Sequence, residues 1–135
     1  MKRFYLILTM ILSAFIISGC SNVVKENSIN DNESRVVEIT AEEAKEEIEK
    51  GNVVILDVRT KEEYESGHIE NSILIPLDEI KVEAENILND KDKKILVYCR
   101  SGNRSATAAN LLVEMGYNNI YDFCGIKDWT YEIVK

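Results

Sequence analysis

The sequence is poor in the residues from which protein metal sites are built. It has one histidine, His68, and three cysteines, Cys20, Cys99 and Cys124, of which no two form a Cys-x-x-Cys pair. A structural zinc site needs about four closely spaced cysteine and histidine ligands. We therefore expect no metal site and no other cofactor in this protein.

Basic residues are also in the minority. Sixteen Lys and Arg stand against 24 Asp and Glu, which gives a formal net charge of −8. Proteins that bind nucleic acid or anionic lipid through charge need a basic surface. The composition therefore argues against a nucleic-acid partner, and it makes any local cluster of basic residues more informative.

The N-terminal segment differs in character from the rest of the chain. A short positive start precedes an apolar stretch at 4–17, and Ser18 and Gly19 lead directly to Cys20. This pattern is typical of a signal peptide. Residues 17–20 resemble the lipobox of bacterial lipoproteins. The resemblance implies cleavage after Gly19, a lipid on Cys20, and a location in the cell envelope, anchored to the membrane and facing outside the cytoplasm.

This interpretation divides the chain into three regions. Residues 1–19 are the signal peptide, residues 20–35 are the lipidated cysteine and a polar, flexible tether, and residues 36–135 are one folded domain. The signal peptide holds two basic and no acidic residues, so its removal changes the net charge from −8 to −10. An uncleaved membrane anchor is the alternative. A plain secreted protein fits less well, because a cysteine directly follows the small residues.

Apolar runs and helical patterns alternate within residues 36–135. Strands are predicted at 36–39, 53–58, 72–75, 95–98 and 119–123, and helices at 41–50, after 60, after 78 and at 106–115. Strands that alternate with helices predict an α/β fold, with a mostly parallel central sheet of about five strands flanked by helices.

Helix starts are marked by the capping residues. Thr40 with Glu43, and Thr60 with Glu63, have the spacing of capping boxes at the first two helices. We expect Asp78 to cap the third helix and Ile87 to lie on its inward face.

Cys99 lies where a predicted buried strand gives way to a predicted helix. The residues that follow it are polar or basic: Arg100, Ser101, Gly102, Asn103, Arg104 and Ser105. Unpaired N–H groups at a helix N-terminus and in a concave loop stabilise an anion, which here is the thiolate of the cysteine. We interpret Cys99 as a catalytic nucleophile and the loop as its substrate-binding cradle. The alternative is a buried, inert cysteine.

Several separated motifs together resemble the rhodanese family of sulfurtransferases. They are Leu56–Arg59, Glu62–Tyr64, Gly67–Ile69, Asn71–Leu77, Cys99–Ser105, Gly116-Tyr117 and Gly125–Trp129. The resemblance implies transfer of a sulfane sulfur from a donor such as thiosulfate to cyanide, a small thiol or a thiol-bearing protein, through a persulfide on Cys99. We expect Arg100 to attract the anionic donor and Arg104 to hold the loop through Asp57. Arg59 is expected to be structural.

The spacing from Cys99 to Arg104 separates sulfur transfer from phosphate hydrolysis. The pattern is Cys-x4-Arg, whereas related Cys-dependent phosphatases resemble Cys-x5-Arg, in which the longer loop holds a tetrahedral phosphoryl group. A non-catalytic module that carries sulfur or binds a partner is the other alternative. A disulfide between Cys99 and Cys124 stays open, and we interpret His68 as a packed histidine rather than a base.

Overall fold

The computed structural model describes residues 35–135, except for the side chain of Cys124. The predicted signal peptide, the lipidated Cys20 and all but the last residue of the tether lie outside this part. The question of a disulfide between Cys99 and Cys124 stays open, because the side chain of Cys124 lies outside it. Within residues 35–135, no helix combines the length and the apolar character that crossing a membrane requires.

The predicted α/β fold is confirmed. Its strands are β1 (Val37–Glu38), β2 (Val53–Asp57), β3 (Ile73–Leu74), β4 (Lys94–Cys99) and β5 (Ile120–Gly125). They form one sheet in the order β1-β5-β4-β2-β3, and every neighbouring pair is parallel. All the strands therefore have their carboxyl ends at the same edge of the sheet, where open α/β folds place their ligand sites.

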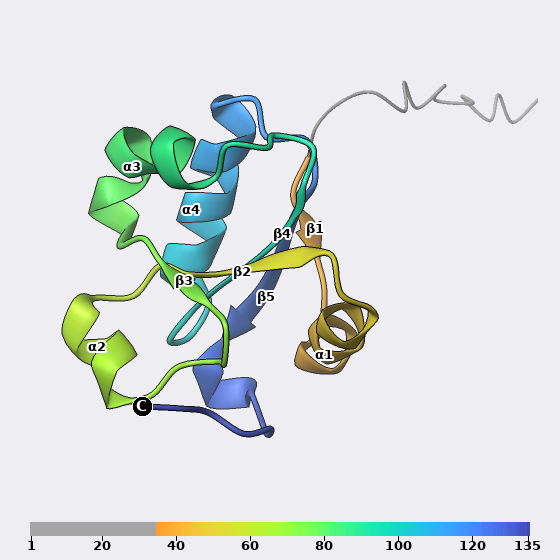
Figure 1. Ribbon diagram of the computed structural model, residues 1–135, viewed down its shortest axis with the longest axis vertical. Helices are drawn as coiled ribbons and strands as arrows, with labels where there is room; N and C mark the ends of the chain where they lie inside the picture. Colours follow the sequence, from red (N-terminus) through yellow and green to blue (C-terminus); the bar gives the residue numbers. More distant parts are fainter. Residues whose placement is uncertain (1–34) are drawn as a thin grey trace, which may run out of the picture. The chain divides into compact units, whose positions relative to one another are not determined.

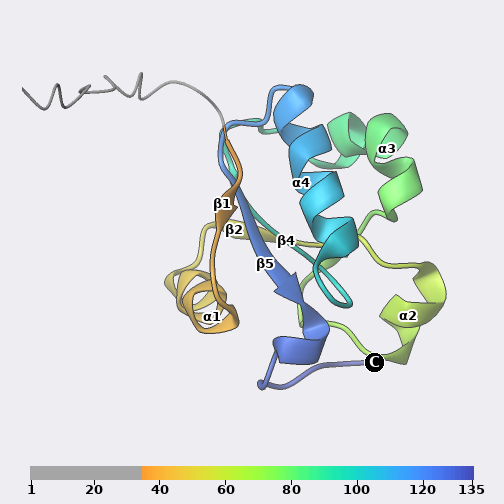
Figure 2. The ribbon, with the colours of Figure 1, turned by 180° about the vertical axis from the view of Figure 1, so that it is seen from behind.

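Helices cover both faces of the sheet. They are α1 (Ala41–Lys50), α2 (Lys61–Ser66), α3 (Ile80–Ile87) and α4 (Asn103–Glu114), with 3₁₀-helices η1 (Leu77–Glu79) and η2 (Ile126–Asp128). The first helix lies alone on one face, and α3 and α4 lie on the other (Figures 1 and 2). The second helix lies toward the edge at which the strands end (Figure 1).

Strand β4 shows how the sequence fills both layers. Ile95, Val97 and Cys99 point to the core under α3 and α4, whereas Leu96 and Tyr98 point to the core under α1. All five side chains are buried. Because successive side chains of a strand alternate between faces, a strand covered on both sides has to be apolar throughout. Each of its fully buried aliphatic side chains contributes about 1.5–3 kcal/mol to folding.

Both predicted capping boxes are present. The Thr40 hydroxyl accepts a hydrogen bond from the Glu43 N–H, and the Glu43 carboxylate accepts one from the Thr40 N–H. The same reciprocal pair joins Thr60 and Glu63 at the start of α2. The start of each helix is therefore determined by residues within one helical turn of it.

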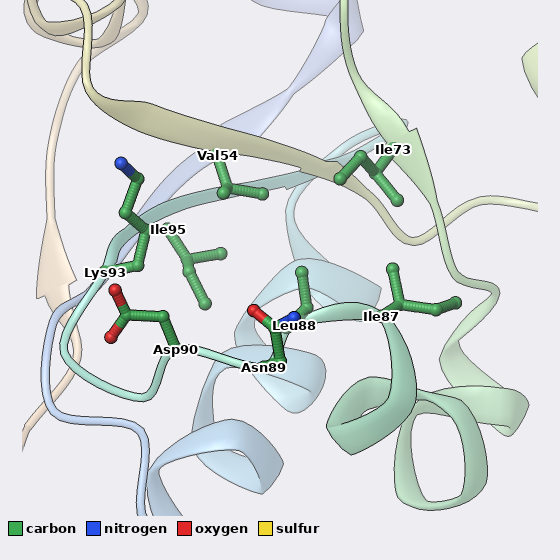
Figure 3. A pocket seen from close by; sticks show the side chains of 8 residues that line it. All are labelled: Val54, Ile73, Ile87, Leu88, Asn89, Asp90, Lys93 and Ile95. Atoms are coloured by element: carbon green, nitrogen blue, oxygen red, sulfur yellow. The ribbon is translucent and has the colours of Figure 1, made fainter.

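The expectations for the third helix are wrong in two respects. Asp78 lies inside η1, and no side chain caps α3. Ile87 is 42 % exposed, and it lines a cavity of about 260 Å³ together with Val54 and Ile73 (Figure 3). Strand β3 pairs only with Leu56 and Asp57 at the end of β2, so within the described residues Val54 has a neighbouring strand, β4, on one side alone. Ile87 lies beside this uncovered side of β2 and stays partly exposed.

Candidate active site

Cys99 is the last residue of β4, at the carboxyl edge of the sheet. The chain then passes through Arg100 and Ser101 to Gly102, where φ is +103°, and α4 begins at Asn103. The helix starts three residues earlier than the sequence predicts. A left-handed conformation at Gly102 is accessible to glycine without strain, and it turns the strand directly into the helix. Ser105 therefore lies in the first turn of α4, within reach of the cysteine sulfur.

The Cys99 sulfur lies inside a ring of hydrogen-bond donors. The Gly102 N–H donates to Sγ at 3.1 Å, and the Ser105 hydroxyl lies 3.7 Å from Sγ. Although burial raises the pKa of the Cys99 thiol, hydrogen bonds between the sulfur and the backbone and hydroxyl of Ser105, and between the sulfur and the backbones of Ser101 and Gly102, outweigh it. The net effect lowers the pKa, because each of these bonds favours the thiolate over the thiol.

Burial distinguishes this cysteine from an exposed one but does not make it inert. Its exposed fraction is 1 %, so the sulfur lies beneath the loop rather than on its surface. An inert core cysteine is surrounded by apolar groups, which raise its pKa. Here the surroundings include polar donors that lower it. The arrangement therefore favours the thiolate form of a buried cysteine.

Arg104 is held by Glu63 of α2, and the expected contact with Asp57 is wrong. Its two terminal nitrogens donate to the two carboxylate oxygens of Glu63 at 2.6 and 2.9 Å. The hydrogen bonds from Arg104 lower the pKa of Glu63 to about 2. Two parallel charge-assisted hydrogen bonds fix the orientation of the guanidinium, and the carboxylate neutralises its charge. The ion pair therefore ties the first turn of α4 to α2.

Asp57 pairs instead with Arg59, at the end of β2. The Arg59 Nη2 lies 2.6 Å from the Asp57 carboxylate and 2.8 Å from the Gly67 carbonyl oxygen. Both side chains are buried. Burial by itself would lower the pKa of Arg59, but the hydrogen bond to Asp57 outweighs this and raises it. The pair fastens the end of β2 to the end of α2.

The outer residues of the loop face solvent. Arg100, Ser101 and Asn103 are exposed, whereas Ser105 is buried. Arg100 forms no ion pair with any residue of the described chain. In a strongly acidic protein, this leaves an exposed cation on the residue that follows Cys99, with no ion-pair partner among the described residues. An anionic substrate would be attracted to this position.

His68 packs against α2 rather than facing the cysteine. Its ring stacks on Tyr64, with centroids 3.7 Å apart, and its Nδ1 lies 2.9 Å from the Tyr64 carbonyl oxygen. Its backbone pairs with Val134 near the C-terminus. This geometry agrees with a packed histidine. Within residues 35–135, no three Cys, His, Asp or Glu side chains gather in a way that could hold a metal ion.

Comparison with known families gives a match over most of the chain. Residues 40–132 match the rhodanese-like domain. The chain belongs to the rhodanese-like family.

Individual relatives of this rhodanese-like protein carry names from sulfur chemistry. One is the thiosulfate sulfurtransferase PspE of Escherichia coli, 38 % identical over 80 residues, which are 59 % of this chain and 77 % of that protein. Another is a putative sulfur carrier protein, YrkF of Bacillus subtilis, 38 % identical over 75 % of this chain. The matched part spans 55 % of the length of YrkF.

Solved structures show the same fold. A rhodanese-related protein from Thermoplasma volcanium superposes with a TM-score of 0.65 at 36 % identity, covering 73 % of this chain and 97 % of that one. A rhodanese with anions from E. coli superposes with a TM-score of 0.58 at 36 % identity, covering 61 % and 96 %.

Two residues of this rhodanese-like site escaped the sequence interpretation. The sequence predicts Glu63 as a helix cap and not as the partner of Arg104, although its place beside Tyr64 in a family motif is a signal. Gly125 lies against the loop, and the motif that contains it in the sequence does not indicate this role. A cleft of about 450 Å³, whose wall includes Val58 and Arg104, borders the loop.

Proposed function

We propose that this protein is a sulfurtransferase that moves a sulfane sulfur from an anionic donor such as thiosulfate to a thiol or cyanide acceptor. The observation that carries the proposal is the ring of N–H groups around the Cys99 sulfur, which favours its thiolate. A thiolate, and not a thiol, is the nucleophile in sulfur chemistry.

In the first step the Cys99 thiolate attacks the outer sulfur of thiosulfate. A new S–S bond forms, and the S–S bond of the donor breaks. Sulfite leaves with the bonding electron pair, so no general acid is needed for its departure. The product is a persulfide anion on Cys99, which the same N–H groups stabilise. Dividing the transfer in this way is covalent catalysis.

In the second step the acceptor attacks the outer sulfur of the persulfide. A thiolate acceptor becomes a persulfide and cyanide becomes thiocyanate, and the electron pair of the broken S–S bond returns to Cys99. Atoms and charge balance without an added oxidant or reductant. The cleft that Arg104 lines borders the loop, and we expect the acceptor to approach from it.

Charge at the mouth of the site favours a small anionic donor. Arg100 is exposed and forms no ion pair with any described residue, whereas Arg104 is committed to Glu63. We therefore assign donor attraction to Arg100 and loop support to Arg104. The loop of six residues from Cys99 to Arg104 suits one added sulfur atom better than a phosphoryl group.

The full-length protein, treated with thiosulfate, tests the proposal directly. Mass spectrometry is expected to show a gain of ~32 Da on the peptide that contains Cys99, which is one persulfide sulfur. Sulfite release should accompany it. The Cys99→Ser variant should lose both signals, and Cys124→Ser, a matched cysteine substitution, should keep both. Absence of the adduct on Cys99 overturns the proposal.

Two other functions are separated by the same experiment. A sulfur carrier, as the name of the B. subtilis relative suggests for that protein, would show the adduct but no turnover with cyanide or small thiols. A phosphatase would hydrolyse an aryl phosphate and gain no sulfur. Multiple turnovers with thiosulfate and cyanide, without phosphate release, support the enzyme.

For the N-terminal region we propose a lipid on Cys20 that holds the domain at the outer side of the membrane. The proposal rests on the lipobox-like residues 17–20. Expression in a bacterium with a labelled fatty acid should label the wild-type protein. Cys20→Ser should abolish the label, and a labelled Cys20→Ser protein would contradict the proposal.

A further inference from the structure

Gly125 is in contact with the backbone of the active-site loop. After an irregularity in the β4–β5 ladder, Cys99 is the register partner of Gly125. A Cβ atom placed on Gly125 would lie 2.3 Å from the Arg100 carbonyl oxygen and 2.7 Å from the Ser101 nitrogen. Both distances are far below a van der Waals contact. Figure 2 shows the loop before α4 beside the end of β5.

The requirement for glycine at this position comes from space and not from conformation. Gly125 has φ −146° and ψ 150°, an extended conformation that any residue adopts. An alanine here would meet no backbone strain of its own. It would instead have to displace the Arg100–Ser101 peptide, because backbone atoms lack the freedom of a flexible side-chain end to move aside.

The same peptide also accepts a hydrogen bond from the segment that contains Gly125. The Lys127 N–H donates to the Arg100 carbonyl oxygen at 3.3 Å. In a trans peptide the C=O and the following N–H point in opposite directions. Fixing the Arg100 carbonyl oxygen toward Lys127 therefore directs the Ser101 N–H away from η2 and toward the cysteine sulfur, where it is one of the donors to Sγ.

We propose that Gly125 and the backbone N–H of Lys127 are positioning groups, which orient the Arg100–Ser101 peptide so that the Ser101 N–H faces Cys99. The proposal deepens the sulfurtransferase function, on which its catalytic meaning rests. The loop after Cys99 packs against the end of β5 and the start of η2, and these contacts determine the orientation of its first peptide. Neither group touches the substrate, and both act through the peptide.

The first test is Gly125→Ala in the full-length protein, with the pKa of Cys99 as the readout. The rate of alkylation by iodoacetamide is measured from pH 4 to pH 10 in the absence of any sulfur donor. One lost charge-assisted hydrogen bond should raise the pKa of Cys99 by about one unit. The matched control is Gly51→Ala, at a glycine with φ +78° and no atom near the added Cβ. It strains the backbone but should leave the Cys99 pKa at the wild-type value.

A second pair of variants keeps the proposal testable if Gly125→Ala does not fold. Lys127→Pro removes the N–H that holds Arg100, whereas Lys127→Ala removes the charge and keeps the N–H. Proline is tolerated in the first turn of a helix. The pKa of Cys99 should be higher in Lys127→Pro than in Lys127→Ala by about one unit. Circular dichroism and Trp129 fluorescence identify the variants that fold.

The outcomes are distinct from those of the sulfur-transfer experiment. The positioning role is overturned if Gly125→Ala or Lys127→Pro folds and its Cys99 has the same pKa as in the matched control. This holds even if Cys99 forms a persulfide. A raised pKa in these variants supports the positioning role, even if the wild-type protein transfers no sulfur. The alkylation profile thus tests the orientation of the peptide, and the adduct with thiosulfate tests the chemistry.

Discussion

Replacing Glu63 with glutamine would remove the negative charge that holds Arg104 and leave the start of α2 intact. Glutamine at this position of a capping box still accepts the hydrogen bond from the Thr60 N–H. Its size matches glutamate, and its amide oxygen can accept one bond from Arg104. The substitution therefore isolates the charge of the ion pair from the capping role of the residue.

The magnitude follows from the pKa of Glu63. Its fall from an ordinary 4.5 to about 2, caused first by the hydrogen bonds from Arg104, corresponds to about 3.4 kcal/mol at 1.36 kcal/mol per unit. This is an upper limit, because the Glu63 and Arg104 side chains are 28 % and 33 % exposed and solvent screens their attraction. We expect a loss of about 1–2 kcal/mol, which lowers Tm by roughly 4–16 °C for a domain of this size.

The pH dependence has a definite sign. A carboxyl group whose pKa is lowered on folding stabilises the folded state above its unfolded pKa, and it loses that effect as the pH falls through its folded pKa. For Glu63 the window runs from 4.5 down to about 2. Urea unfolding at pH 7, 5, 4 and 3 should therefore show the full difference between wild type and Glu63→Gln at pH 7, and a shrinking one below pH 5.

The control is Glu65→Gln on the same helix. Glu65 lies 3.8 Å from Lys61, with both side chains largely exposed, and exposed pairs of this kind contribute little. Its loss should stay within about 0.5 kcal/mol at every pH. The reasoning is refuted if Glu63→Gln costs no more than Glu65→Gln at pH 7, or if its cost is the same at pH 7 and pH 3.

Two further predictions concern the donor and the core. Arg100→Ala should raise KM for thiosulfate about 3- to 10-fold at low salt and change kcat less, and the rise in KM should shrink at 0.5 M salt. Lys81→Ala on α3 is the control. Equal KM values for Arg100→Ala and wild type at low salt contradict the assignment. Tyr98→Phe should cost about 1–3 kcal/mol in urea unfolding, because the buried Ile69 N–H loses its acceptor, the Tyr98 hydroxyl at 3.2 Å. A loss no greater than that of Tyr131→Phe, at an exposed tyrosine, contradicts this account.

Local signals predicted the scaffold of the site better than its contacts. The apolar run that ends at Tyr98 and the polar loop that follows placed Cys99 at a strand end, because both signals depend on neighbouring residues. The sequence predicts Asp57 as the partner of Arg104, but spacing along the chain does not identify which carboxylate the fold brings close to this side chain. In the structure, Asp57 forms its ion pair with Arg59, and Arg104 forms its ion pair with Glu63.

The sequence alone determined the parallel α/β architecture, the capping boxes and the place of Cys99 at the end of a buried strand. These features depend on periodicity and on residues within a few positions of one another. Only the tertiary structure showed that Glu63 pairs with Arg104 and that Gly125 lies against the Arg100–Ser101 peptide. Both contacts join segments more than 20 residues apart, and they exist because parallel strands bring their carboxyl ends, and the loops that follow them, to one edge of the sheet.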